Sequence, residues 1–80
     1  MTKIIFLTVY ELDKVGCENF ERSFNLADCF IARYEPDEDE KQGPYRPIIY
    51  DYKLKKAFAV VNNGEPLDEI WEYLKKLFAE

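Results

Sequence analysis

Few residues of this chain carry reactive side chains, and their types exclude most enzymatic chemistry. Histidine is absent, and Ser23 is the only serine. Histidine is the usual general acid or base near neutral pH, and it commonly activates serine and cysteine nucleophiles. Cys17 and Cys29 therefore have no histidine partner, and a zinc site of cysteine and histidine ligands is excluded as well. We expect a protein that is not an enzyme and that needs no metal or cofactor.

The acidic stretch EPDEDE, residues 35–40, is the other group of side chains that could do chemistry. Paired carboxylates catalyse glycoside hydrolysis when they have a fixed separation and an apolar pocket that tunes their pKa values. A proline-containing loop supplies neither. A calcium-binding EF-hand loop needs glycine at its sixth position and glutamate at its twelfth, whereas counting from Asp37 gives Gln42 and Ile48. The stretch therefore predicts neither a catalytic pair nor a calcium loop.

Charge is unevenly distributed along the sequence. The chain has 16 acidic and 11 basic residues, for a net charge of −5, and residues 35–40 contribute five of the acids. Without that stretch, acids and bases balance. Residues 41–61 then carry five bases and Asp51 as their single acid. The charge pattern is therefore segregated into acidic and basic stretches, and the chain is not uniformly acidic.

The first functional hypothesis is a small acidic protein that docks on a basic surface of another protein. The acidic stretch would act with the exposed face of a C-terminal helix. The predicted contact residues are Glu35, Asp37, Glu38, Asp39, Glu40, Asp68, Glu69 and Glu72. An inhibitor or modulator from a phage or mobile element would have this size and composition, with a host nucleic-acid-handling factor as its target. The opposing interpretation makes residues 35–40 a solvated connection between strands, as most charge runs are.

The alternative hypothesis is a module that binds single-stranded nucleic acid. Aromatic side chains on a sheet can stack on bases while neighbouring cations hold phosphates. The predicted residues are Arg46, Tyr50, Tyr52, Lys53, Lys55 and Lys56. Against this hypothesis, the two tyrosine rings could be buried beneath a helix, and the net negative charge repels phosphate.

The elements that position these residues follow from the apolar pattern. Eighty residues predict one domain over 1–80. β-branched and aromatic residues predict a strand over 3–12, and a second strand covers 28–35 until Pro36 ends it. The ranges 47–53 and 56–61 alternate like a hairpin. Between the first two strands, Cys17, Phe20 and Phe24 have helical spacing and predict one or two turns of helix over 18–24.

The C-terminal segment predicts an amphipathic helix that begins near Pro66. Six apolar residues fall on a face about 120° wide at 100° per residue. They are Leu67, Ile70, Trp71, Leu74, Leu77 and Phe78. The predicted fold is therefore α+β, with a mainly antiparallel sheet of about four strands packed by this helix. No run of about 20 apolar residues predicts a membrane span, and we expect a cytoplasmic protein with reduced thiols.

Overall fold

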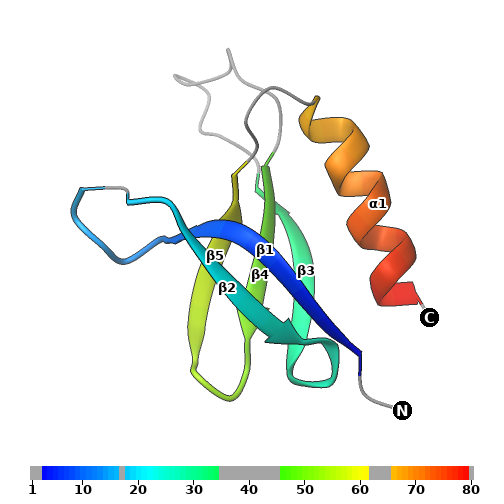
Figure 1. Ribbon diagram of the computed structural model, residues 1–80, viewed down its shortest axis with the longest axis horizontal. Helices are drawn as coiled ribbons and strands as arrows, with labels where there is room; N and C mark the ends of the chain where they lie inside the picture. Colours follow the sequence, from blue (N-terminus) through cyan, green and yellow to red (C-terminus); the bar gives the residue numbers. More distant parts are fainter. Residues whose placement is uncertain (1–2, 17, 35–45, 62–65, 80) are drawn as a thin grey trace.

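The structure is a computed structural model, and it describes residues 3–16, 18–34, 46–61 and 66–79. In these ranges the chain forms an α+β fold of a five-stranded antiparallel sheet and one C-terminal α-helix (Figure 1). The elements are β1 (Ile4–Glu11), β2 (Phe20–Asn25), a 3-10 turn η1 (Leu26–Asp28), β3 (Cys29–Tyr34), β4 (Arg46–Asp51), β5 (Lys56–Val60) and α1 (Leu67–Ala79). None of the described helical segments has the length and apolarity that a bilayer crossing requires.

The sheet is strongly curled. Its strand order is β2-β1-β5-β4-β3, so β2 and β3 form opposite edges although only the three residues of η1 join them in the chain. Phe24 of β2 packs on Phe58 of β5, with ring centroids 5.1 Å apart, although β1 lies between these strands in the order. Figure 1 shows the β1–β2 pair crossing the β3–β4–β5 part obliquely. The curl therefore gives the sheet an enclosed inner face and an exposed outer face.

The hydrophobic core fills the inner face. Val9, Ile49 and Phe58 are fully buried there, and Leu74 of α1 joins the same cluster. Because Leu74 packs with inward-facing strand residues, α1 covers the inner side of the sheet, where it contacts β3 and β4. The outer face has no helix over it among the described residues.

The helix follows its predicted amphipathic pattern, except that Trp71 is not fully buried. Leu74 is fully buried, while Ile70, Leu77 and Phe78 pack against the core from its edge. Trp71 is only half-buried, and its ring centroid lies 5.7 Å from the Arg33 guanidinium and 5.9 Å from the Lys75 ammonium. Leu74 therefore anchors the helix, and Trp71 covers the margin of the core.

Residues 20–25 form β2, so the helix predicted over 18–24 is wrong and the sheet has one strand more than expected. The spacing of Phe20 and Phe24 fits both structures, because positions i and i+4 share a face in a helix and in a strand. In β2 these rings point inward with Arg22, whose guanidinium carbon lies 5.0 Å from the Phe58 ring centroid. The helical element after the first strand is instead the short η1 turn. Cys17 lies outside the described residues.

Candidate functional site

The outer face of β3 and β4 carries a cluster of aromatic side chains. Successive strand residues point to opposite faces, so Ile31 and Ile49 face the core while Phe30 and Tyr50 face outward. The antiparallel register places Phe30 directly opposite Tyr50. The opposing interpretation, in which the rings of Tyr50 and Tyr52 lie beneath a helix, is therefore wrong, because α1 covers the other face.

The rings of Phe30, Tyr50 and Tyr52 form a triangle of mutual contacts. Their centroids are 5.4 Å apart for Phe30–Tyr50, 5.2 Å for Phe30–Tyr52 and 5.7 Å for Tyr50–Tyr52. These distances are typical of stabilising aromatic pairs. Phe30 is nonetheless 41% exposed and Tyr52 is 54% exposed. The three rings therefore pack against one another and remain accessible to solvent.

A buried carboxylate accepts backbone hydrogen bonds in the turn between β4 and β5. Asp51 is 8% exposed, and its Oδ1 accepts hydrogen bonds from the backbone N–H groups of Lys53 at 2.9 Å and Leu54 at 3.0 Å. The Tyr52 N–H donates to the Asp28 carbonyl at 2.8 Å. These bonds fix the backbone that follows β4. They position Tyr52, whose ring contacts Phe30, at the start of the turn that contains Lys53 and Lys55.

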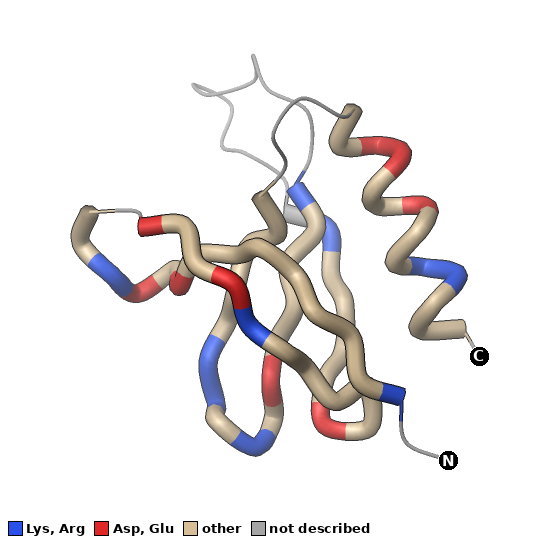
Figure 2. The backbone as a smooth tube through the Cα atoms, viewed as in Figure 1, with Lys and Arg blue, Asp and Glu red and all other residues tan. Residues whose placement is uncertain are grey.

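Three lysines occupy this turn and the start of β5, and Figure 2 shows the basic positions gathered there. The Lys56 ammonium lies 3.6 Å from a carboxylate oxygen of Glu11. In the part of the chain that the structure describes, Lys53 and Lys55 are exposed and have no carboxylate within ion-pair distance. We call Phe30, Tyr50, Tyr52, Lys53 and Lys55 the aromatic–lysine surface.

Arg46 lies on the same outer face, at the other end of β4. Its Nη1 donates a hydrogen bond of 2.9 Å to the hydroxyl of Tyr10, which lies two strands away across β5. Six residue steps separate Arg46 from Tyr52, or about 20 Å along an extended strand. Arg46 therefore lies well apart from the two turn lysines with which the sequence grouped it.

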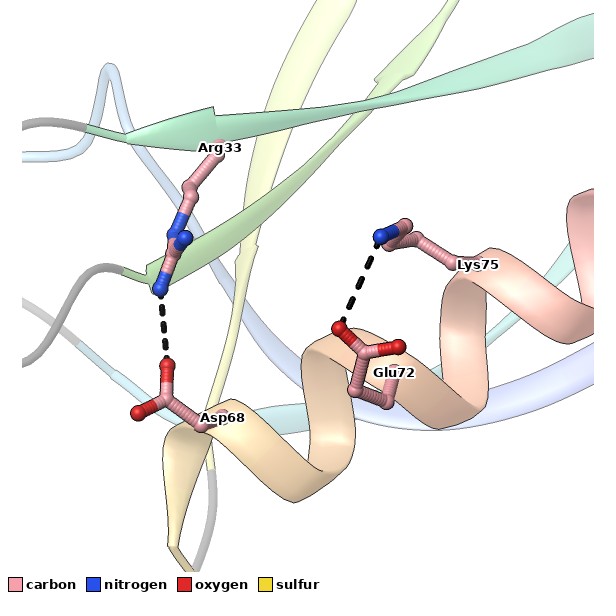
Figure 3. A network of polar contacts seen from close by, with 4 residues as sticks. All are labelled: Arg33, Asp68, Glu72 and Lys75. Carbon is pink, nitrogen blue, oxygen red and sulfur yellow. Dashed lines mark hydrogen bonds and ion pairs between the residues drawn. The ribbon is translucent and has the colours of Figure 1, made fainter.

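The acidic contacts predicted from the sequence divide into two groups. Glu35, Asp37, Glu38, Asp39 and Glu40 lie outside the described residues. On α1, Asp68 forms a 2.7 Å ion pair with Arg33, and Glu72 lies 3.5 Å from the Lys75 ammonium (Figure 3). Glu69 is exposed on the same helix. Two of the three predicted helix carboxylates are therefore partly neutralised within the domain.

The Cys29 thiol is free and buried at the start of β3. Burial raises its pKa to about 11, and the nearby carboxylates of Asp51 and Asp28 add to the shift, while Arg22 opposes it. The thiolate is the reactive form of cysteine, so Cys29 is almost entirely the unreactive thiol at neutral pH. It packs in the core as a small apolar side chain.

Two residues of this outer face were missed by sequence reasoning. The alternation of residues 28–35 places Phe30 on one strand face, but the pairing of that strand with Tyr50 depends on a register that the sequence does not specify. Tyr10 appeared only as part of an apolar strand. In the described ranges, no group of three acidic or cysteine side chains converges as a set of metal ligands.

Comparison with known proteins finds no matching family model, no matching curated protein and no matching solved structure. The proposals that follow therefore depend on the geometry and chemistry of this chain alone.

Proposed function

We propose that this domain is a non-catalytic binding module that holds single-stranded nucleic acid on the aromatic–lysine surface. The observation that supports it is the exposed ring triangle of Phe30, Tyr50 and Tyr52 beside two lysines without ion-pair partners in the described residues. Stacking a base on an aromatic ring contributes about 1–3 kcal/mol and does not depend strongly on base identity. Lysines next to the rings can reach the phosphates on either side of a stacked base.

The arrangement of the rings favours a single strand over a duplex. Bases in a duplex are already stacked on each other, so their faces are not available to a protein ring. The three rings also contact one another and are fixed to rigid strands, which lowers the conformational entropy that binding must remove. A free strand can place one or two bases on this platform without any rearrangement of the sheet.

The net charge of −5 opposes phosphate binding, but its distribution weakens the objection. The acids of residues 35–40 follow Tyr34, which pairs with Arg46 at the end of the sheet remote from the β4–β5 turn. The described residues by themselves hold ten basic and nine acidic side chains.

A titration with three probes tests the proposal directly. The probes are a fluorescein-labelled oligothymidylate of about 12 nucleotides, a duplex of the same length and a mononucleotide, and the readouts are fluorescence anisotropy and amide NMR shifts. We expect the single strand to bind at least about tenfold more tightly than the duplex, with a logarithmic salt slope near −1.4 for two phosphate contacts. NMR shifts should concentrate at residues 29–31 and 50–55. Equal affinity for the duplex, or no binding at low salt, would contradict the proposal.

Docking of the acidic residues on a basic protein remains a second proposal, and neutralising the acidic stretch separates the two. Replacing Asp37, Glu38, Asp39 and Glu40 by Asn or Gln changes the net charge from −5 to −1. If these carboxylates steer a basic partner, association with a lysine-rich peptide should slow by about tenfold at low salt. The same change should leave oligothymidylate binding intact or strengthen it severalfold, because a repulsive charge is removed. Unchanged association with the peptide at every salt concentration contradicts the steering role.

We also propose that the domain acts inside the cell. The support is the free, buried Cys29, which is an ordinary state for a thiol in a reducing compartment.

A further inference from the structure

The β4–β5 turn contains a backbone conformation that lysine adopts unfavourably. Lys55 has φ = 55°, and it is the single non-glycine residue with positive φ in the described part of the chain. In the left-handed region, Cβ of an ordinary side chain lies too close to the following carbonyl oxygen. Glycine avoids this contact, and asparagine tolerates it better than lysine does. A lysine at this position therefore makes the folded turn less stable than glycine or asparagine would.

With the residues that the structure describes, the Lys55 side chain makes no contact that would offset the steric strain of its backbone. It is exposed, and within the described residues it has no ion pair, hydrogen bond or ring contact. Lys56 differs, because it pairs with Glu11, whereas the Lys53 side chain resembles that of Lys55 and only its backbone N–H is bound, by Asp51. Residues held in sparsely populated backbone conformations cluster at functional sites.

The strained lysine also has a suitable position for a ligand. It lies three residues after Tyr52 in the chain, in the turn whose backbone Asp51 holds through its hydrogen bonds to Lys53 and Leu54. We propose that Lys55 is the principal phosphate-binding residue of the aromatic–lysine surface and occupies a strained turn position for that purpose. This inference rests on the proposed binding of single-stranded nucleic acid.

The test compares stability and affinity in the same variants. Lys55→Gly and Lys55→Asn should raise the melting temperature by a few degrees, on the order of 3 °C, because the steric strain is relieved. The same variants should bind the labelled oligothymidylate about fivefold to tenfold more weakly, with the salt slope reduced by about 0.7, the value for one lost phosphate contact. Lys55→Arg, which keeps the positive charge, should retain most of the affinity.

Lys53→Gly is the matched control, since it removes the same charge from the same turn at a position without positive φ. Lys53→Gly should lower the melting temperature, whereas Lys55→Gly should raise it. It should also reduce the affinity for oligothymidylate by less than Lys55→Gly does. If Lys55→Gly binds as the wild type does, or loses no more than Lys53→Gly, the inference is wrong while the proposed function stands. If the wild-type chain binds no oligothymidylate, the proposed function fails and this inference fails with it.

Discussion

Replacing Phe30 and Tyr52 together by alanine is expected to weaken binding of an oligothymidylate by at least about 30-fold. Each base–ring stack contributes about 1–3 kcal/mol, and two lost stacks at the lower limit correspond to this ratio. The effect will not be the sum of two single variants, because the rings are in contact with centroids 5.2 Å apart. Fluorescence anisotropy on the single and double variants measures both the loss and the coupling.

Two companion variants show whether the loss arises from the rings themselves. Tyr73→Ala removes a tyrosine that is 58% exposed on α1, away from the outer face of the sheet, and should leave affinity unchanged. Tyr52→Phe keeps the ring and should retain binding. If the Phe30 and Tyr52 double variant keeps wild-type affinity with a normal melting curve, the nucleic acid binds at another place.

The largest effect on stability is expected for Phe58→Ala. Phe58 is fully buried at the centre of the inner face, where its ring lies 6.2 Å from Phe20 and 5.1 Å from Phe24. Deleting a buried phenylalanine ring costs about 3–5 kcal/mol. Because small domains have unfolding free energies of only about 5–15 kcal/mol, the variant should melt far below the wild type or lose its cooperative transition.

Phe6→Ala provides the comparison, since Phe6 is 63% exposed on the outer side of β1. This change should shift the unfolding free energy by no more than about 0.5 kcal/mol. Denaturant titration followed by tryptophan fluorescence and circular dichroism measures both variants. Equal losses for the two would mean that the curled sheet does not enclose its core around Phe58.

The sequence predicted most elements of this fold because most of them have one dominant periodicity. The C-terminal helix has a 3.6-residue apolar pattern, and α1 covers Leu67–Ala79 as that pattern requires. The hairpin of β4 and β5 alternates with period two and was also predicted. Residues 20–25 differ, because FERSFN places Phe20 and Phe24 on one face in either structure. Pairing with β1, which is a tertiary property, selects the strand.

The candidate site was predicted in its parts but not in its assembly. Tyr50, Tyr52 and the turn lysines follow from residue type and alternation. Which side of β4 the helix would cover does not follow, because Ile48 and Ile49 make both faces apolar. Phe30 joins the tyrosines only through the β3–β4 register, and eleven intervening residues separate those strands in the chain.

The strand order also affects how fast this domain can fold. The β3–β4–β5 part pairs neighbouring strands, whereas β1 pairs with β5 through contacts such as Val9 with Val60, 51 positions apart. Bringing distant segments together removes chain entropy before any contact offsets it, so such pairings slow folding. We therefore expect the strands that carry the aromatic–lysine surface to pair first, because their contacts join residues nearer in the chain, and the pairing of β1 with β5 to limit the rate at which the curled sheet closes.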